Sequence, residues 1–372
     1  MSEMGRLSYR RSDVLLQRKC NVNFYVAFAL LACYDLYSEV RFMKETRDIE
    51  YKSDITNTFL KTVSAFSNYD GGKIIFGIDD SGAVIGSDNP AAKCIDIENR
   101  INDSISPKPE YSLDVNCDNN TIILAVKAGS NKPYMYKGKA YRRNDTASIE
   151  VDTLQLRSLV LEGSNISFEE LEYNTGDLTF HELEEALKDK LGISHINEDI
   201  LRTVGFFTKD KKYNNAAALF ADSNDFYGID IARFGHSINE ILDRETISGV
   251  SVLCMYRKTI ELYRRYYQYE EIIDVERRNV ELIPEKAFRE AVANALIHRR
   301  WDIRSHIRVE MYADRIEIKS PGGLPSGITG DEFIHGAISN LRNPIEGNIF
   351  FRLKYIEMFG TGIRRIMDSY SG

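Results

Sequence analysis

The chain has 372 residues, of which 43% are hydrophobic and 28% are charged, a composition typical of a soluble globular protein with two or three domains. Its formal net charge of -8 excludes a uniformly basic nucleic-acid binder, so any contact with phosphate must come from local patches. The five cysteines are scattered without paired spacing, which excludes a disulfide framework or a zinc site and favours a reducing cytoplasm.

A basic segment and an apolar run open the chain. Cations at Arg10, Arg11, Arg18 and Lys19 precede the run at Phe24–Tyr34. This run is too short to cross a bilayer, which takes about 20 residues. The pattern resembles the basic and apolar regions of a signal peptide. An appended helix or a translated upstream stretch is the interpretation we favour over export.

Residues 55–126 predict an alternation of helices and strands. We expect helices at Ile55–Asn68 and Ala91–Ile105, a core strand at Lys73–Ile78, and a hairpin of Tyr111–Val115 with Thr121–Val126. Gly71 and Gly72 follow the last periodic position of the first helix, where a residue with positive φ is needed to end it. A turn at residues 79–82 then places two aspartates at the carboxyl end of the core strand, where open sheets tend to keep their chemistry.

Three carboxylates of this region, Glu45, Glu50 and Asp80, are a candidate metal and catalytic site because a family resemblance implies that role for them. Carboxylates around a hard cation such as Mg²⁺ or Mn²⁺ can orient a water and offset charge on a phosphorane-like transition state. Glu45 and Glu50 are five residues apart, which puts them on opposite faces of a regular strand, so the metal site requires a bulge or bend between them. The alternative is a solvated acidic strand edge with a turn aspartate that is favoured for its local hydrogen bonds.

A basic stretch rich in tyrosine occupies residues 132–143 and contains no acid. Its candidate nucleic-acid contacts are Lys132, Tyr134, Lys137, Lys139, Tyr141, Arg142 and Arg143. Cations hold phosphates while tyrosine rings stack on exposed bases, which suits single-stranded or looped nucleic acid. The alternative is a solvated hairpin whose tyrosines pack inward.

Residues 64–86, together with Glu45, Glu50-Tyr51-Lys52 and Asn68, resemble the Schlafen-type AlbA domain, a nucleic-acid-associated α/β module, over roughly residues 43–150. The resemblance implies that the carboxylates of Glu45, Glu50 and Asp80 bind divalent metal and cleave RNA. It also implies nucleic-acid contact by Lys52 and the basic stretch. The resemblance begins at Met43, a sensible natural start, which is why we favour an upstream or appended segment for residues 1–42.

The middle of the chain, residues 151–280, carries little functional signal. We expect helices at Leu154–Leu161, Thr179–Leu191 and Ile247–Tyr269, and strands at Asn214–Phe220 and Ile229–Phe234. Basic pairs on the last of these helices are explained more simply by a solvated face than by phosphate contact. We interpret this segment as an α/β linker domain.

A helix at residues 284–300 carries the second strong signal. Its Glu290, Asn294 and His298 are spaced at i, i+4 and i+8, which places them on one face. Because alanines and apolar residues surround this face, we expect it to line a pocket. A glutamate there can polarise a water, and an asparagine can hold Mg²⁺.

Two glycine turns follow this helix. A hairpin of Ile307–Met311 with Arg315–Lys319 leads to a loop that contains Gly322 and Gly323, and Gly360-Thr361-Gly362 opens a final helix. Glycines just before a helix let backbone N–H groups close on phosphate.

In this order the elements resemble the GHKL ATPase fold of gyrase, Hsp90, histidine kinases and MutL. They are most similar to the divergent form joined to AlbA domains in bacterial transcriptional regulators or helicase-related proteins, which Arg342-Asn343-Pro344 and residues 356–362 match closely. The resemblance implies ATP binding with Glu290 as base and Asn294 on magnesium. The other implied nucleotide contacts are His298, Gly322, Gly323, Gly360, Thr361 and Gly362. The aspartate that reads adenine in most GHKL proteins falls near Ser320, a weaker acceptor, which leaves adenine selectivity and hydrolysis open.

We therefore predict an α/β protein with an extension at 1–42, an AlbA-like mixed sheet with helices at 43–150, an α/β middle segment at 151–280 and a GHKL-like α/β sandwich at 281–372. The predicted function is an ATP-binding, nucleic-acid-binding regulator in which nucleotide in the last domain modulates the AlbA module. A metal-dependent nuclease is the competing hypothesis. The expected cofactors are ATP and Mg²⁺, with Mn²⁺ as a substitute. We expect DNA or RNA and a second copy of the chain as partners, no membrane, and a cytoplasmic location.

Overall fold

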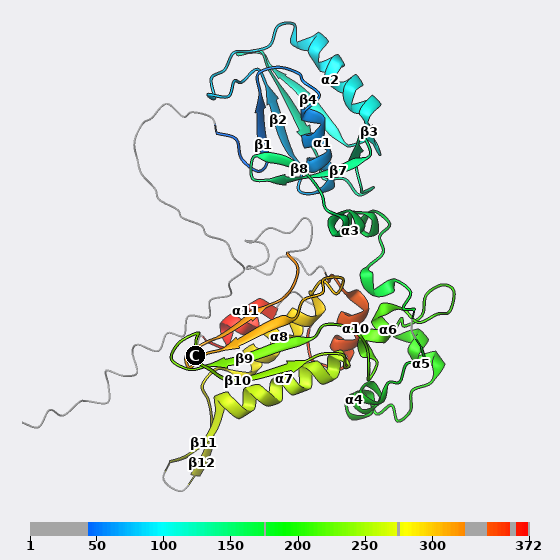
Figure 1. Ribbon diagram of the computed structural model, residues 1–372, viewed down its shortest axis with the longest axis vertical. Coiled ribbons are helices and arrows are strands. Elements are labelled where there is room, and N and C mark those ends of the chain that lie inside the picture. The colour runs from blue at the N-terminus through cyan, green and yellow to red at the C-terminus, as the bar shows by residue number, and fades with distance from the viewer. Residues whose placement is uncertain (1–43, 175, 274–275, 324–340, 358–361, 371–372) are drawn as a thin grey trace, which may run out of the picture. The chain divides into compact units, whose positions relative to one another are not determined.

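The structure is a computed structural model, and it describes residues 44–174, 176–273, 276–323, 341–357 and 362–370. The chain divides after Phe168 into two compact units, each with its own sheets and helices (Figure 1). The expected α/β class is confirmed, because both units combine helices with sheets of mixed or antiparallel strands. The predicted extension at residues 1–42 lies outside the described residues.

Two four-stranded sheets and three helices form the first unit. One sheet has the order β1-β2-β5-β4, with β1 parallel to β2 and the other pairs antiparallel, and the second has the order β3-β6-β7-β8 and is antiparallel. The strands are β1 Ile49–Lys52, β2 Gly72–Phe76, β3 Ile105–Ser106, β4 Tyr111–Asn116, β5 Thr121–Val126, β6 Met135–Tyr136, β7 Lys139–Asn144 and β8 Ala147–Glu150. The helices are α1 Phe59–Asn68, α2 Pro90–Ser104 and α3 Thr153–Gly163.

α1 contacts strands of both sheets and forms the centre of the first unit. Nine of its ten residues are buried, so this helix has no polar face, as expected of a helix enclosed on all sides. Its polar side chains are satisfied internally: Asn68 donates to the carbonyl of Tyr134 at 2.9 Å and accepts the Tyr134 N–H at 2.7 Å. The helix ends at the predicted glycine pair, where Gly71 has φ +76° and a Cβ would lie 2.9 Å from the Val126 carbonyl.

One four-stranded sheet with the order β10-β9-β13-β14 organises the second unit, and β9 runs parallel to β13. The long helices α7 and α8 pack on each other, and α10 and α11 pack on α8 (Figure 1). The strands are β9 Ile229–Phe234, β10 Ile241–Ile247, β11 Gln268–Ile273, β12 Glu276–Glu281, β13 Ile307–Met311 and β14 Ile316–Lys319. The helices are the short η1 Phe168–Glu170, α4 His181–Leu191, α5 Glu198–Thr203, α6 Asn215–Phe220, α7 Val252–Tyr267, α8 Glu285–Ile297, α10 Pro344–Arg352 and α11 Gly362–Asp368.

The domain boundary expected at residue 280 falls inside this second unit, because β9 from one side of it and β13 from the other share a sheet. The β11–β12 hairpin, which the sequence did not predict, connects α7 to α8. In the part of the chain that the structure describes, we find no helix with the length and apolar character needed to cross a membrane.

The prediction of a strand at Asn214–Phe220 is wrong, since this segment forms α6. The side chain of Asn214 accepts the N–H of Ala217 at 3.0 Å and so caps the helix. Three alanines follow, and alanine is the best helix former. All six residues of α6 are buried, which gave the segment the apolar look of a core strand.

Candidate nucleotide site and nucleic-acid surface

α8 carries the predicted line of polar residues. The helix begins after Pro284, and most of its residues are buried against neighbouring elements. Glu290 is 7% exposed, and Asn294 and His298 are half-buried. The polar line is therefore withdrawn from bulk water.

Glu290 is a buried carboxylate that has no ion pair within the described residues. Burial raises the pKa of Glu290, while the nearby charge of Arg365 and a hydrogen bond with Asn294 partly offset this effect. A carboxylate with a raised pKa is a better proton acceptor at neutral pH than an ordinary glutamate. The pair of Glu290 and Asn294 thus combines a candidate base with an amide oxygen one turn away.

The final helix, α11, brings one predicted glycine position onto this pair. A Cβ at Gly362 would overlap Glu290 Oε1 and would lie 3.0 Å from Asn294 Nδ2. A larger residue at this position would displace the Glu290 carboxylate, so glycine lets the backbone approach both polar side chains closely. Ile366 packs on Ala287 and Ala291 and holds α11 against α8.

The other glycine turn lies at the C-terminal end of α8. Arg342 connects this turn to the end of α8. Its Nη1 donates to the His298 carbonyl at 2.7 Å, and its Nη2 donates to the Gly323 carbonyl at 2.7 Å. Gly322 has φ +113°, and a Cβ there would lie 2.8 Å from Arg342 Nη1. The structure thus places Gly322, Gly323 and His298 around one guanidinium.

Other predicted nucleotide contacts are used differently. Burial and the charge of Arg342 lower the pKa of His298 to about 4, so its ring is neutral at pH 7. The hydroxyl of Ser320 donates to the Ala295 carbonyl at 2.7 Å and is engaged inside the fold. Gly360 and Thr361 lie outside the described residues.

The three carboxylates of the first unit are not brought together as metal ligands. Glu45 precedes β1 and accepts the N–H of Tyr51 at 2.9 Å, Glu50 is buried in β1, and Asp80 is exposed in the turn after β2. Nowhere in the described segments do three His, Cys, Asp or Glu side chains form a group that could hold a metal ion. The local hydrogen bonds of the turn belong to Asp79, whose pKa they lower.

Glu50 is instead the centre of a buried ion-pair network. Its Oε2 accepts from Arg143 Nη1 at 2.5 Å and from the Thr62 hydroxyl at 2.6 Å, and its Oε1 pairs with Lys52 Nζ at 2.8 Å. Arg143 is 8% exposed. Because a buried carboxylate needs matching cations, Arg143 and Lys52 are committed to the fold.

Some side chains of the basic stretch are buried or form ion pairs, and others do not. Tyr134 and Tyr141 are 2% and 7% exposed and belong to the core, so the inward-packing alternative holds for both rings. Lys132 and Lys139 each form an ion pair with a glutamate, at 2.8 and 2.7 Å.

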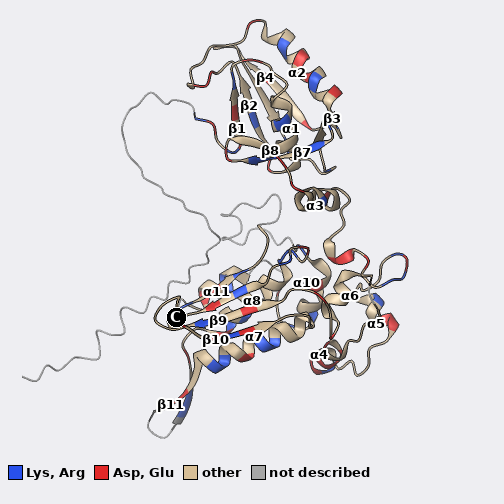
Figure 2. Cartoon of the chain, in the orientation of Figure 1, with Lys and Arg blue, Asp and Glu red and all other residues tan. Residues whose placement is uncertain are grey.

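Lys137 and Arg142 are the predicted contacts that have no ion pair among the described residues. Lys137 is exposed, with its Nζ 5.3 Å from the centroid of the Tyr136 ring. Arg142 is partly exposed in β7, yet its Nε is buried without a hydrogen-bond partner. A guanidinium with unused donors is a candidate anion contact. Acidic and basic segments are interspersed on both units in Figure 2, so any such surface is local.

A buried network that the sequence analysis missed begins at the first residue of the second unit. Glu169 is fully buried and accepts the N–H groups of Ile345 at 2.5 Å and Glu346 at 2.9 Å, which caps α10. The buried Asn343 donates to two carbonyls at the end of α8, at 3.0 and 2.9 Å. Only the Arg342-Asn343-Pro344 motif pointed to this region, and nothing in the sequence signalled Glu169.

The network extends to a second buried carboxyl group. Glu346 Oε2 accepts the indole N–H of Trp301 at 2.9 Å, and its Oε1 has no hydrogen-bond partner. The guanidinium of Arg299 lies 4.2 Å from the Trp301 ring centroid. Burial raises the pKa of Glu346 to about 8 and that of Glu169 to about 7. Two carboxyl groups near α8 thus titrate close to neutral pH.

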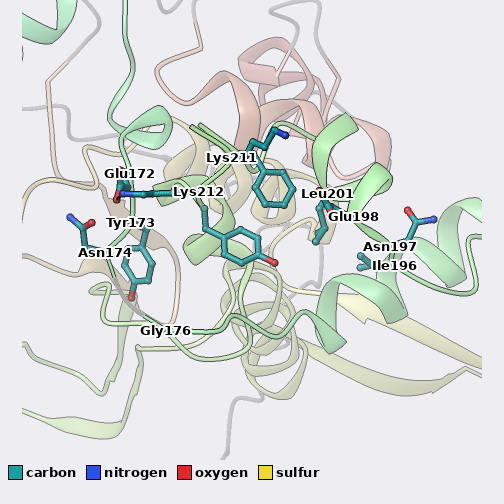
Figure 3. Close-up of a pocket in the computed structure, with 12 residues that line it drawn as sticks. Glu172, Tyr173, Asn174, Gly176, Ile196, Asn197, Glu198, Leu201, Lys211 and Lys212 are labelled. Carbon is teal, nitrogen blue, oxygen red and sulfur yellow. Dashed lines mark hydrogen bonds and ion pairs between the residues drawn. The ribbon is translucent and has the colours of Figure 1, made fainter. Parts of the chain in front are cut away.

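An open hollow of about 720 Å³ lies in the same unit, and none of its lining residues belongs to α8 or to the glycine turns (Figure 3). Lys212 reaches Glu172 along one wall, at 2.6 Å. No sequence motif predicted this hollow. It is lined by Glu172, Tyr173, Asn174, Gly176, Ile196, Asn197, Glu198, Leu201, Phe207, Lys211, Lys212 and Tyr213.

Comparison with known families yields two matches. Residues 45–152 match the family described as "Schlafen, AlbA_2", and residues 304–372 match the family described as "Putative ATP-dependent DNA helicase recG C-terminal". The second match begins after α8, so Glu290 and Asn294 precede it. No curated protein matches the chain.

Several solved structures match this chain, among them the following two. The DIP2311 protein of Corynebacterium diphtheriae shares 19% identity, with 87% of this chain and 70% of that chain covered and a TM-score of 0.49. The N-terminal domain of a RecG-related protein of Nitrosomonas europaea shares 25% identity, with 30% and 86% covered and a TM-score of 0.22. The two family matches confirm the resemblance drawn from the sequence: the chain joins a region of the Schlafen AlbA_2 type to a region of the recG C-terminal type.

Proposed function

We propose that the protein is a nucleotide-dependent, nucleic-acid-binding regulator, in which ATP and Mg²⁺ at the second unit modulate the affinity of the AlbA-like unit for DNA or RNA. The observation that carries the proposal is the close approach of Gly362 to Glu290 and Asn294. Two motifs that lie far apart in the sequence, and that the resemblance assigns to one nucleotide site, touch each other. The AlbA_2 and helicase-related family matches support the pairing of nucleic-acid and ATP functions.

The residues at α8 fit a magnesium nucleotide. Mg²⁺ prefers oxygen ligands, and the amide oxygen of Asn294 supplies one beside Glu290. At Gly362 and Gly322 the backbone stands where a side chain would clash, which leaves backbone N–H groups as the donors for phosphate oxygens. When bound, Mg²⁺ neutralises phosphate charge and polarises the phosphoryl group. Glu290 accepts a proton from water, and Asn294 orients the carboxylate through their hydrogen bond.

The nucleic-acid surface of the first unit centres on Arg142 and Lys137. Their charges are not neutralised by an acid within the described residues, whereas those of Lys52 and Arg143 are neutralised by Glu50. We therefore assign phosphate contact to Arg142 and Lys137 and a structural role to the Glu50 network. A nuclease function gains no support here, because Glu50 is already surrounded by cations.

The coupling between the two functions has a physical candidate in the Glu169 network. Arg342 holds the Gly323 carbonyl and the end of α8, and the adjacent Asn343 holds two further carbonyls there. α10 begins at the next residue, and Glu169 caps it. Since Glu169 directly follows the last residue of the first unit, a shift of the glycine loop on nucleotide binding changes the anchor of the connecting segment. Pairing of two copies and a cytoplasmic location stay predictions.

Calorimetry with the full chain and Mg·ATP tests the nucleotide site. We expect Asn294→Ala to abolish magnesium-dependent binding, because the amide that holds the metal is lost. Asn279→Ala, on the exposed β12, is the matched control and should bind as the unchanged protein does. Equal affinity in Asn294→Ala and the control would refute the site. In a parallel anisotropy measurement, Mg·ATP should alter affinity for labelled RNA or single-stranded DNA in the control but not in Asn294→Ala.

A further inference from the structure

The open hollow in the second unit is built by residues from three short segments. Isolated bridges pair Glu172 with Asn214 and Phe207 with Tyr213, and the N–H of Tyr173 donates to the Tyr213 carbonyl at 2.9 Å. Its volume of about 720 Å³ lies within the range of ordinary ligand pockets, roughly 300–1,000 Å³. The hollow is therefore large enough for one planar ring with a phosphate beside it.

Aromatic rings form the apolar part of its wall, and the fold holds them in place. Phe207 and Tyr213 are stacked, with ring centroids 5.0 Å apart and an angle of 20° between their planes. The buried Phe180 supports Tyr213 edge-on at 5.9 Å. Both stacked rings are half-buried and line the hollow, and the guanidinium of Arg202 lies 5.9 Å from the centroid of the Phe207 ring. A stacking platform that is rigid before a ligand arrives loses little entropy on binding.

Two basic side chains near the hollow form ion pairs, whereas Lys211 has none among the described residues. Lys212 pairs with Glu172 at 2.6 Å, and Arg202 pairs with Glu198 at 2.6 Å. Lys211 lines the hollow, is exposed, and has no ion pair among the described residues. Its position is fixed by the turn at residues 208–212, in which its N–H donates to the Thr208 carbonyl at 3.0 Å.

We propose that this hollow binds an unstacked base of a single-stranded nucleic acid, with the base on the Phe207–Tyr213 rings and the neighbouring phosphate at Lys211. Aromatic rings accept any base face, and a lysine beside them supplies the phosphate contact. A single open lysine is too little charge for a free triphosphate, which favours a strand over a mononucleotide. The inference rests on the nucleic-acid part of the proposed function, but it adds a second contact on the unit that does not match AlbA_2.

Fluorescence anisotropy of the full chain with a labelled 12-mer of single-stranded RNA or DNA tests the proposal. Phe207→Leu removes the stacking surface and retains an apolar side chain, and we expect affinity to fall by about 5- to 150-fold. Lys211→Gln should lower the slope of affinity against salt by about 0.7, the value for one phosphate contact with a single strand. Lys188→Gln removes an exposed lysine of α4 that does not line the hollow, so it serves as the control with unchanged binding.

The outcomes separate this inference from the proposed function. Loss of affinity in Phe207→Leu together with the smaller slope in Lys211→Gln supports it. If Phe207→Leu fails to fold, Lys211→Gln decides, because Lys211 is exposed and contributes nothing to the core. If both variants bind as the unchanged protein does while Arg142→Gln weakens binding, the hollow is not a binding site for a base. The phosphate contact assigned to the AlbA-like unit is then unaffected. Tight competition by AMP shows a mononucleotide site and overturns this inference as well. If the protein binds neither single-stranded RNA nor single-stranded DNA, both this inference and the nucleic-acid part of the proposed function are wrong.

Discussion

Two buried glutamates, one in each unit, use the same chemical group in opposite ways. Glu50 is 4% exposed and Glu290 is 7% exposed, so both carboxylates are removed from water to a similar degree. Glu50 is matched by Arg143 at 2.5 Å and Lys52 at 2.8 Å. Glu290 has a hydrogen bond with Asn294 and no ion pair among the described residues, and burial raises its pKa although the charge of Arg365 partly offsets this effect.

The comparison separates a carboxylate that is matched by cations from one that has no ion pair among the described residues. A buried charge with two cations is held in one state and cannot easily accept a metal or a proton. A buried carboxylate that lacks such partners is costly to keep and remains able to bind a cation. For this reason we place the chemistry of the protein at α8 rather than at the acidic residues of the AlbA-like unit.

The largest expected effect comes from breaking the structural pair. Arg143→Ala leaves Glu50 buried with a single cation, and we expect the free energy of unfolding of the first unit to fall by about 3–5 kcal/mol. Arg142→Ala in the same strand is the control, with a loss below about 1 kcal/mol because that side chain has no ion pair. Urea unfolding followed by circular dichroism measures both. A stable Arg143→Ala protein with weakened nucleic-acid binding would instead show that Arg143 serves the ligand.

Neutral substitutions of the two glutamates sharpen the comparison. Glu50→Gln removes the counterion of two cations and should cost about 1–3 kcal/mol of stability. Glu290→Gln should cost less than about 0.5 kcal/mol or increase stability, because it removes a buried charge that has no ion pair. Thermal unfolding of both variants decides the point, and the same loss in both would erase the distinction that we draw.

A pH series extends the comparison to Glu169 and Glu346. Their folded-state pKa values, about 7 and about 8, lie above the ordinary value of 4.5, so the folded unit keeps protons that the unfolded chain has released. The contribution of these two groups to the free energy of unfolding should therefore be greatest below about pH 4.5. It should fall as the pH rises towards 8. The slope for each group is at most about 1.4 kcal/mol per pH unit.

Trp301, the single tryptophan of the chain, donates to Glu346 and reports on this transition directly. Urea midpoints followed by its fluorescence between pH 5 and 9 measure the slope. Glu346→Gln, which keeps an acceptor for the indole N–H but cannot ionise, should reduce the pH dependence. An undiminished slope in that variant would mean that other groups control the stability of the second unit.

Local patterns predicted the elements whose signal is strong and short in range. The strand β2, the hairpin β4–β5 and the helix α8 could be read from periodicity and from glycine positions. The helix α6 could not, since its short apolar run at residues 216–220 fits a buried helix as well as a strand.

The candidate site, like the fold, could be predicted only where its signal is local in the sequence. The line of Glu290, Asn294 and His298 follows from helical spacing, but side-chain pairing across long sequence separations does not. Glu50 and Arg143 are 93 residues apart, and the sequence assigned one to metal and the other to nucleic acid. Glu169 and Ile345 are 176 residues apart, and no local pattern connects them. Such pairs exist only once tertiary packing has brought the two segments together.

The close approach at Gly362 has a consequence for related chains. A side chain at this position would meet the carboxylate oxygen of Glu290, so a change there is accommodated by displacement of that carboxylate, by a shorter residue at position 290 or by movement of the last helix. Positions 290 and 362 should accordingly mutate in concert among relatives that keep α11 docked. Relatives in which the two positions vary independently would have either a displaced side chain at position 290 or a different arrangement of their final helix.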